Sequence, residues 1–336
     1  MNSETSDVTM TTEPRGHSPL LSIVVPCYCE QENLPVLHDR IERALVGQSF
    51  DWELLLIDDH SPDGTFDVAC ELARKHARVR AFRLARNGGS HLVSFVGFDL
   101  ARGDAAVVMA ADLQDPPEVL AELVAKWRGG DQVVWACRSE RVNVGAIGRA
   151  SSAAYNKLIS AMVTDYRLPP EGADFFLIDR VVIDALKRCQ EIRPNVLALI
   201  LWLGFRQGTI SYKKEARLHG SSGWTFRRKV RLLIDSVTGF SHVPLRLMPV
   251  AGFVIAAAGF LYALDIVIGQ IIAPAPVEGW ASLMVVVLVL SGAQMMMLGV
   301  IGEYLWRALE ESRRRPRYSI ERALDRARNG APPGQE

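Results

Sequence analysis

Three oxygen-bearing side chains follow an apolar run near the middle of the chain. The segment VVMAADLQDPPE, residues 107–118, places Asp112, Gln114 and Asp115 just after a strand predicted at 105–110. Hard divalent cations such as Mg²⁺ prefer carboxylate and carbonyl oxygens, and they often share the phosphates of a substrate. The sequence therefore predicts a metal–diphosphate site. The alternative is an acidic turn that only caps the following helix with negative charge.

Polar groups also end the neighbouring predicted strands. Asp58 and Asp59 end the second strand, Arg86 follows the third, and Arg138 ends the fifth. Strands that alternate with helices form a parallel sheet, and ligands of such sheets bind beyond the carboxyl ends of the strands. We therefore expect these side chains on one edge. No G-x-G-x-x-G follows the first strand, which argues against a nicotinamide or flavin dinucleotide.

The elements that must position these groups are read from hydrophobic periodicity. The strands are predicted at 21–26, 52–59, 79–84, 105–110 and 131–138, and the intervening helices at 34–46, 65–76 and 91–101. Further helices are predicted at 149–165, 181–189 and 196–203, and a strand leaving the core at 210–217. Together they predict an α/β catalytic domain over residues 19–225, preceded by a disordered tail at 1–18.

Composition narrows the function class. The 336 residues carry no formal net charge, so bulk charge gives no reason to expect nucleic acid as a partner. The five cysteines are odd in number and lack zinc-like spacing, which argues against a disulfide framework. Cys27 and Cys29 are interpreted as small apolar fillers at a strand end. No apolar signal-peptide segment occurs near the N-terminus, so we expect the catalytic part in the reducing cytosol.

The C-terminal third predicts a membrane anchor. Residues 247–273 and 280–306 are apolar and exceed the roughly 20 residues needed to cross the hydrocarbon core. Their connection, 274–279, has no Lys or Arg, whereas Arg246 and Arg307 flank the pair, so both termini are expected on the cytoplasmic side of the inner membrane. Residues 226–245 predict a basic amphipathic helix at the headgroup layer, or alternatively an ordinary surface helix. Residues 307–336 are expected to form a basic cytoplasmic tail.

Several motifs in a fixed order carry a family resemblance. They are IVVPCYCE, LLIDDHSPDGT, ARNGGSH, MAADLQDPPE, RLHGSSGWTF and the paired apolar segments that end in GEYLWR. Over about residues 21–318 the chain resembles the family-2 glycosyltransferases of the GT-A fold, and more narrowly the polyprenyl-phosphate glycosyltransferases. The resemblance implies inverting transfer of a sugar from a UDP- or GDP-sugar to an undecaprenyl-type phosphate, with Mg²⁺ or Mn²⁺, for cell-envelope glycan synthesis or modification.

The resemblance also implies roles for individual residues. The nucleotide would be bound by Pro26, Tyr28, Glu30, Asp58, Asp59 and Arg86. The metal would be held by Asp112 and Gln114. The catalytic residues would be Asp112, Asp115, Arg138, Arg149 and Arg217. The acceptor phosphate would meet Arg138, Arg149, Arg217, Ser221 and Ser222. Asp115 would either orient the sugar or act as a weak base, and the residues do not separate these two roles.

Three positions depart from the family pattern. Ala110 stands where the D-x-D motif has its first Asp, Cys29 replaces the usual Asn, and Phe176 replaces a frequent Arg. Ala110 motivates one alternative, a silent homologue that binds nucleotide or lipid without catalysis. A polysaccharide synthase is a second alternative, although the Q-x-x-R-W motif of such synthases is absent. Gly252 and Gly259 would permit close helix packing in a homo-oligomer.

Overall fold

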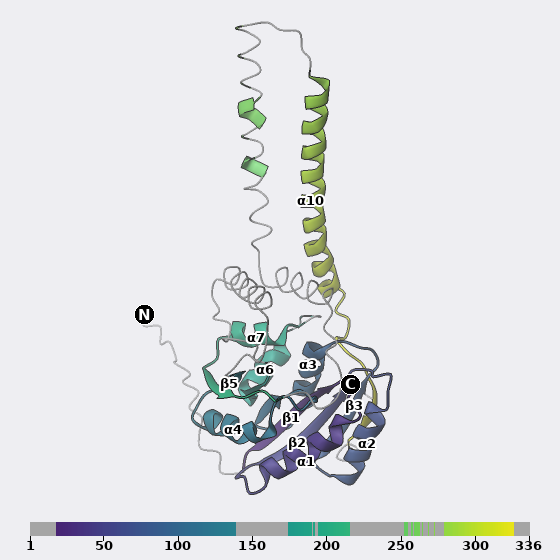
Figure 1. Cartoon of the computed structure of the whole chain (residues 1–336), viewed down its shortest axis with the longest axis vertical. Coiled ribbons are helices and arrows are strands. Elements are labelled where there is room, and N and C mark those ends of the chain that lie inside the picture. Colours follow the sequence, from purple (N-terminus) through teal and green to yellow (C-terminus); the bar gives the residue numbers. More distant parts are fainter. Residues whose placement is uncertain are drawn as a thin grey trace, which may run out of the picture. The chain divides into compact units, whose positions relative to one another are not determined.

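The computed structural model describes residues 18–138, 174–189, 191, 194–215 and 279–325, with single positions between 252 and 272 (Figure 1). The chain divides into two compact units. The first comprises Met1–Val144, Leu168–Ser222 and Pro316–Glu336, and the second comprises Gly145–Arg167 and Gly223–Arg315. Residues 1–17 of the predicted tail, the predicted helices at 149–165 and 226–245, and residues 326–336 lie outside the described residues.

The first unit is built on an eight-stranded sheet with the order β7-β5-β6-β4-β1-β2-β3-β8. The strands are β1 (Leu20–Cys27), β2 (Asp51–Asp58), β3 (Val79–Leu84), β4 (Ala105–Val108), β5 (Val133–Arg138), β6 (Phe176–Asp179), β7 (Gln207–Tyr212) and β8 (Ile320–Leu324). Only β6 and β8 pair antiparallel with their neighbours, so β1–β5 and β7 run in one direction. The prediction of an α/β sheet rich in parallel strands is confirmed, and the carboxyl ends of these strands share one edge.

Helices cover both faces of this sheet (Figure 1). They are α1 (Asn33–Leu45), α2 (Thr65–Lys75), α3 (Ser90–Leu100), η1 (Pro117–Val119), α4 (Leu120–Arg128), α6 (Arg180–Arg188) and α7 (Val196–Leu203). Helices α1, α2 and α4 pack on one face, and α3, α6 and α7 pack together on the other. The predicted helices at 34–46, 65–76, 91–101, 181–189 and 196–203 are all confirmed to within about a residue at each end.

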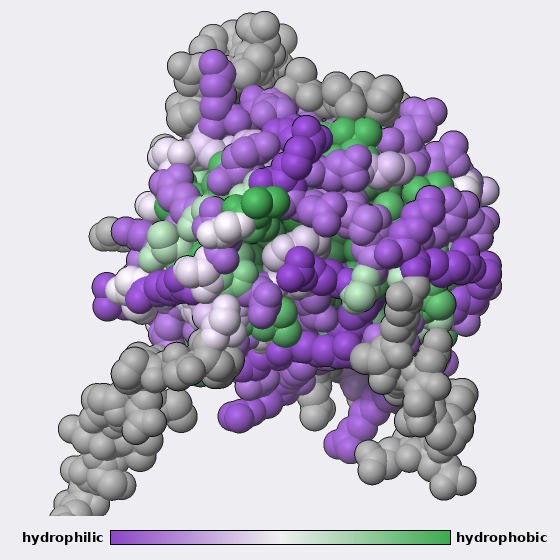
Figure 2. All heavy atoms as spheres, turned by 90° about the horizontal axis from the view of Figure 1, so that it is seen from below, coloured by the Kyte–Doolittle hydropathy of each residue, from purple (hydrophilic) through white to green (hydrophobic). Residues whose placement is uncertain are grey.

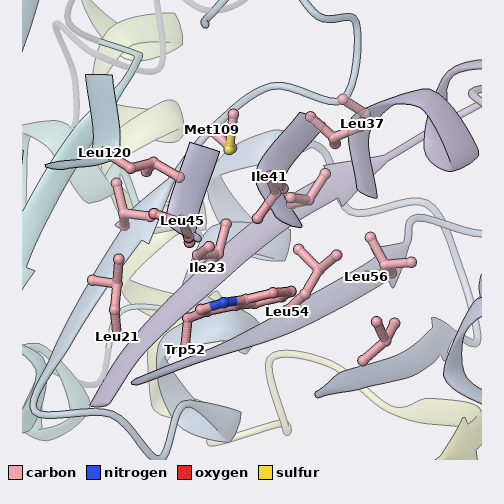
Figure 3. Close-up of a cluster of buried hydrophobic side chains, with 14 of the residues drawn as sticks. Leu21, Ile23, Leu37, Ile41, Leu45, Trp52, Leu54, Leu56, Met109 and Leu120 are labelled. Carbon is pink, nitrogen blue, oxygen red and sulfur yellow. The ribbon is translucent and has the colours of Figure 1, made fainter. Parts of the chain in front are cut away.

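The core beneath α1 shows how the apolar spacing works. Leu37, Ile41 and Leu45 recur every four residues, which places them on one side of a helix. They belong to one cluster of buried side chains with Leu21 and Leu54 of the sheet (Figure 3). Each fully buried side chain of this size contributes about 1.5–3 kcal/mol. Hydrophilic residues cover most of the face in Figure 2, as expected when apolar side chains collect in such a core.

Two strands differ from the sequence prediction. β7 begins at Gln207, three residues before the predicted start, and it pairs with β5 as an edge strand of the sheet rather than leaving the core. β8 lies within the segment assigned to a basic tail, yet it pairs antiparallel with β3. Both are edge strands whose side chains are largely exposed, so neither carries the continuous apolar run of a central strand.

The amino-terminal edge of the sheet holds a buried ionic network. Arg80 lies between two carboxylates, with Nη1 2.9 Å from Glu53 and Nη2 3.0 Å from Asp325. Ser22 Oγ and the Arg102 N–H both donate to Glu53 Oε1, at 2.6 and 2.8 Å. Because Asp325 directly follows β8, these contacts fasten the C-terminal strand to the sheet.

The described part of the second unit is dominated by α10 (Trp280–Ser312), a helix of 33 residues (Figure 1). Its start coincides with the second predicted membrane segment. Among the residues that the structure describes, no helix has both the length and the apolar character needed to cross a membrane. The paired segments at 247–273 and 280–306 remain predictions.

Candidate active site

The carboxyl edge of the sheet carries strained backbone. Within the described residues, three of the non-glycine residues with positive φ lie in loops that follow strands here: Cys29 (58°), His60 (58°) and Leu113 (61°). A non-glycine residue in this region crowds its own carbonyl, at a cost of roughly 1–2 kcal/mol. Such strain persists where the surrounding structure imposes it, and it concentrates at functional sites. These loops follow β1, β2 and β4.

The loop after β4 places the predicted metal ligands side by side. Asp112 Oδ1 accepts the Gln114 N–H at 3.2 Å, which closes a tight turn around Leu113. The Leu113 side chain is buried, and this burial holds the strained turn in place. The Gln114 carbonyl accepts the Glu215 N–H at 3.0 Å, so the segment after β7 braces the loop. Asp112 and Gln114 therefore share one fixed turn, as the metal-site prediction requires.

Asp115 belongs to a chain of polar contacts that crosses the sheet edge. The Tyr212 hydroxyl donates to Asp115 Oδ1 at 2.6 Å, and the Ala110 N–H approaches Asp115 Oδ2 at 3.4 Å. Tyr212 ends β7 and is paired in register with Arg138 at the end of β5. The Arg138 guanidinium also interacts electrostatically with the Tyr212 hydroxyl. The order Arg138–Tyr212–Asp115 thus links three strand ends.

Arg138 retains hydrogen-bonding capacity beyond this chain. Its Nη2 lies 3.5 Å from Asp174 Oδ2, which is a long contact to an exposed carboxylate. Its Nε is buried and has no hydrogen-bond partner within the described part of the chain. A buried donor without a partner is costly, so such a group marks a place where a ligand can supply the acceptor. Arg138 is therefore suited to bind an anion.

The pKa shifts of Asp115, Tyr212 and Arg138 follow from their burial and from their contacts with one another. Burial raises the pKa of Asp115, and the hydrogen bond from Tyr212 and the nearby Lys214 partly oppose that rise. Burial, together with the charge of Asp115, raises the pKa of Tyr212 above its ordinary value. Burial alone would lower the pKa of Arg138, but Tyr212 and the carboxylates of Asp174 and Asp115 raise it instead. Tyr212 stays a neutral donor and Arg138 stays a cation.

Asp58 and Asp59 organise the loops beside the site. Both oxygens of Asp58 accept the Ser61 N–H, at 3.1 and 3.3 Å. Asp59 accepts the Gly88 N–H at 2.7 Å and the Gly89 N–H at 2.8 Å. Burial raises the pKa of Asp59, and the two amide donors oppose that rise. These internal bonds tie the end of β2 to the loop before α3, while the predicted nucleotide contacts of both residues stay predictions.

The loop after β1 holds the other predicted nucleotide residues. The Cys29 N–H donates to Ser61 Oγ at 3.0 Å, and the Glu30 N–H donates to Thr65 Oγ1 at 2.9 Å. The Glu30 carboxylate accepts a hydrogen bond from the Asn33 side chain. This loop is thus fastened to the loop after β2. Three further predicted residues lie at the same edge, half-buried or exposed: Pro26, Tyr28 and Arg86.

Some predictions lie elsewhere or need correction. Four predicted acceptor residues lie outside the described residues: Arg149, Arg217, Ser221 and Ser222. Phe176 is 2% exposed and packs against Trp135 with ring centroids 5.2 Å apart, so this departure from the family pattern fills the core. Cys27 is buried as predicted, but the filler interpretation is wrong for Cys29, which is exposed because its strained loop turns outward.

Sequence reasoning missed Tyr212. The residue was covered by a predicted strand at 210–217, but no motif marked its hydroxyl as part of a site. Its position at the carboxyl end of a strand was the available signal, because that end of every parallel strand faces the ligand edge. Tyr212 is buried and contacts Asp115 across 97 residues of sequence, a separation that spacing rules cannot bridge.

The donors at this edge fit a hard divalent ion. Asp112 and Gln114 offer oxygen atoms in one turn, and Asp115 lies beside them. Within the described residues, no trio of His, Cys, Asp or Glu side chains converges at this edge. Mg²⁺ is usually bound through one or two carboxylates and completes its shell with water and substrate phosphates. The absence of a carboxylate at Ala110 is therefore compatible with a metal–diphosphate site.

Comparison with known proteins places the chain in a family. The model of the family "Glycosyl transferase family 2" matches residues 22–186. An uncharacterized glycosyltransferase of Bacillus subtilis (strain 168), YkcC, is 35% identical over 302 residues, which cover 90% of this chain and 93% of that protein. A prophage bactoprenol glucosyl transferase homolog of Escherichia coli (strain K12) is 32% identical, covering 90% of this chain and 98% of that protein.

The solved structures that match this chain are more distant. Mannosyltransferase PcManGT from Pyrobaculum calidifontis, in complex with GDP-Man and Mn²⁺, covers 88% of this chain and is itself covered to 91%. It aligns with 18% identity and a TM-score of 0.43. Since full-length relatives are at least 30% identical and aligned over about nine-tenths of both chains, this chain belongs to glycosyl transferase family 2.

Proposed function

We propose that the chain transfers a sugar, with inversion, from a nucleoside diphosphate sugar to a polyprenyl phosphate. The relatives that match it over about 90% of its length include proteins named bactoprenol glucosyl transferase. The observation that carries the proposal is Arg138, a cation at the carboxyl edge whose buried Nε has no partner in the described residues. An acceptor that is itself a phosphate would supply the missing partner.

A phosphate acceptor also explains what the site lacks. A phosphate monoester has a second pKa near 6, so it is already largely ionised at neutral pH and needs no strong general base. Asp115 is poorly placed to act as one, because Tyr212 occupies one carboxylate oxygen and the Ala110 N–H faces the other. We therefore assign Asp115 a positioning role, in which it holds Tyr212 and, through it, the guanidinium of Arg138.

The reaction brings two anions together, so the negative charges of the acceptor phosphate and of the donor diphosphate must both be stabilised by cations. Arg138 would bind the acceptor phosphate, to which guanidinium groups donate charge-assisted hydrogen bonds. Asp112 and Gln114 would hold Mg²⁺ or Mn²⁺, which stabilises the negative charge that develops on the leaving diphosphate. The loops after β1 and β2, which are fastened to each other, would receive the nucleotide.

The acceptor is a lipid, and we propose that the chain meets it at the inner membrane. The apolar segments 247–273 and 280–306 would form a hairpin, and the basic helix at 226–245 would lie in the headgroup layer. Basic residues near an anionic surface each contribute about 1 kcal/mol of attraction. This topology leaves the sheet and both termini in the cytoplasm. Labelling of single cysteines in the 274–279 loop from the periplasmic side tests it.

The test of function is transfer of labelled sugar into an organic-extractable lipid. Purified full-length protein would receive polyprenyl phosphate, Mg²⁺ or Mn²⁺, and a panel of UDP- and GDP-sugars. We expect label in the lipid phase, loss of transfer with EDTA, and a fall of about 100–1,000-fold in Asp112→Ala, the range seen when one charge-stabilising group is removed from an active site. Asp67→Ala, an exposed carboxylate on α2, is the matched control and should retain activity.

Other outcomes separate the alternatives. Measurable nucleotide binding without transfer from any donor would contradict the proposal and favour a silent homologue, with Ala110 as the motivating residue. Label that appears in a polymer rather than in the lipid extract would favour a polysaccharide synthase. The donor that succeeds also identifies the nucleotide base and the sugar.

A further inference from the structure

A second cluster of metal-ligating side chains lies outside the transfer site. His38 and Glu42 are four residues apart on α1, which places them on the same face of that helix. His76 is the C-cap of α2. Potential ligand atoms of these three residues all lie within 4.8 Å of one another. β3 begins shortly after His76. The cluster therefore lies toward the amino ends of the strands, away from Asp112.

The environment of His38 points to a ligand. The side chain is only 1% exposed, yet its Nε2 has no hydrogen-bond partner. Its other ring nitrogen, Nδ1, lies 3.4 Å from Asp39 Oδ1. A metal-bound histidine commonly donates its second ring N–H to a carboxylate, which leaves the opposite nitrogen with the lone pair that binds the metal. In the tautomer with its proton on Nδ1, His38 matches this arrangement.

The second histidine completes the geometry. The rings of His38 and His76 have centroids 3.9 Å apart and planes inclined by 44°. Two imidazolium cations at this separation would repel each other, whereas two neutral imidazoles can direct lone pairs at a common ion. Glu42 is exposed and adds a carboxylate on the solvent side. The set of two imidazoles and one carboxylate is one that Zn²⁺ accepts while keeping a fourth position open.

We propose that His38, Glu42 and His76 form a second metal site that takes Zn²⁺ or a similar transition metal. Its chemistry differs from that of the carboxyl edge, because imidazole suits Zn²⁺, Ni²⁺ and Cu²⁺ whereas oxygen donors suit Mg²⁺ and Mn²⁺. The bound ion cross-links α1 to the end of α2. Because α1 directly follows the loop that carries Tyr28 and Glu30, this cross-link steadies one wall of the transfer site from outside it.

Cobalt provides a probe that distinguishes the two sites. Full-length protein stripped with EDTA would be titrated with Co²⁺ and followed by visible absorption, which is intense for a four-coordinate nitrogen-containing site and weak for a six-coordinate oxygen site. We expect an intense band that saturates at one Co²⁺ per chain and disappears on addition of one equivalent of Zn²⁺. Asp112→Asn should leave this band unchanged, since it alters only the carboxyl edge.

Variants of the cluster then assign the band. His76→Ala should abolish it, and Glu42→Gln should weaken Co²⁺ binding at least about tenfold, because loss of even an outer partner of a metal site costs about 10–100-fold. Glu42 is exposed, so Glu42→Gln should unfold at the same temperature as wild type without metal. Glu71→Gln, an exposed carboxylate on α2, is the matched control and should bind normally. An absent band, or one that survives His76→Ala, would overturn the proposal.

Discussion

Both edges of the central sheet contain a buried arginine, but the two arginines have different partners. At the amino edge, Glu53 and Asp325 surround Arg80, and neighbouring donors fill the remaining oxygens of Glu53. At the carboxyl edge, Arg138 meets one distant carboxylate and a tyrosine hydroxyl, and its Nε is left without a partner in the described residues. The Nε of Arg80 is also buried without a partner in the described residues, but two carboxylates lie within 3.0 Å of the Arg80 guanidinium, whereas Asp174 lies 3.5 Å from the guanidinium of Arg138 and is exposed.

Backbone strain divides in the same way. Within the described residues of the first unit, the non-glycine residues with positive φ all lie in loops beyond the carboxyl ends of the strands. Those loops are held by side-chain bonds such as Asp112 to Gln114 and Asp59 to Gly88. The contacts at the amino edge stabilise the fold. At the carboxyl edge, strained loops lower the stability and hold a site in a fixed shape.

The largest effect is expected at the amino edge, in Asp325→Ala. Removal of this carboxylate leaves Arg80 buried with one partner fewer, and breaking a buried ion pair costs about 3–5 kcal/mol of unfolding free energy. Transfer activity per folded molecule should not change. Thermal or chemical unfolding of the purified protein measures the loss. Glu321→Ala removes a half-exposed carboxylate of the same strand and should cost no more than about 1 kcal/mol.

Tyr212→Phe probes the carboxyl edge. Deleting the hydroxyl leaves Asp115 with one donor fewer, at a cost of about 1–3 kcal/mol, and frees Arg138 from its alignment. We expect kcat to fall about tenfold, equivalent to about 1.4 kcal/mol, with little change in the KM for the sugar donor. Tyr318→Phe is a matched control, because that hydroxyl also donates to a carboxylate, Asp99, at 3.1 Å. Equal loss of activity in both variants would contradict a specific role for Tyr212.

The pH dependence of stability provides a third test, through Asp115→Asn. Burial raises the pKa of Asp115 in the folded protein, so the native state holds this proton to a higher pH than the unfolded chain does. The contribution of Asp115 to stability is therefore full below the unfolded pKa of about 3.9 and is lost as the pH rises through the native value. Unfolding temperatures measured from about pH 4 upward should show wild type losing stability relative to Asp115→Asn. Parallel curves would disprove the assignment.

The smallest effect concerns strain at Cys29. Asn tolerates the left-handed region better than other non-glycine residues do, and the Cys29 side chain is exposed, so Cys29→Asn should gain about 0.5–1 kcal/mol of stability. Cys29→Ala keeps the unfavourable φ of 58° and should gain nothing. The difference between the two unfolding temperatures isolates the backbone term. If both variants were equally stable, the positive φ of this residue would carry no measurable strain, and the proposed difference in backbone strain between the two edges would lose its support.

The same residue explains a family pattern noted in the sequence. In the motif that reads P-C-Y-C-E here, the family resemblance implies Asn at the position of Cys29. The left-handed conformation of that residue gives the physical reason, since a short polar side chain can hydrogen-bond locally there. The sequence revealed the substitution, but only the backbone angle of 58° shows what the position requires.

Periodicity and strand-end composition predicted most of the fold and placed several candidate side chains at the carboxyl edge. Central strands such as β1 and β2 are buried on both faces, so their continuous apolar runs are unmistakable, and the acids that follow them locate the ligand edge. The edge strands β7 and β8 escaped full prediction because exposed side chains leave no such signal. Tyr212 and Asp325 escaped with them, since each is defined by partners far away in the sequence.

The sequence by itself determined the α/β sheet, the placement of the Asp112–Asp115 segment just after a strand, and the family. Local periodicity and strand-end chemistry suffice for these features, because they depend on residues close together in the chain. Only the tertiary structure decided which charges are satisfied and which remain available. That outcome depends on contacts such as Tyr212 with Asp115 and Arg80 with Asp325, which span 97 and 245 residues. Their geometry exists only once the strands are paired and the side chains are buried.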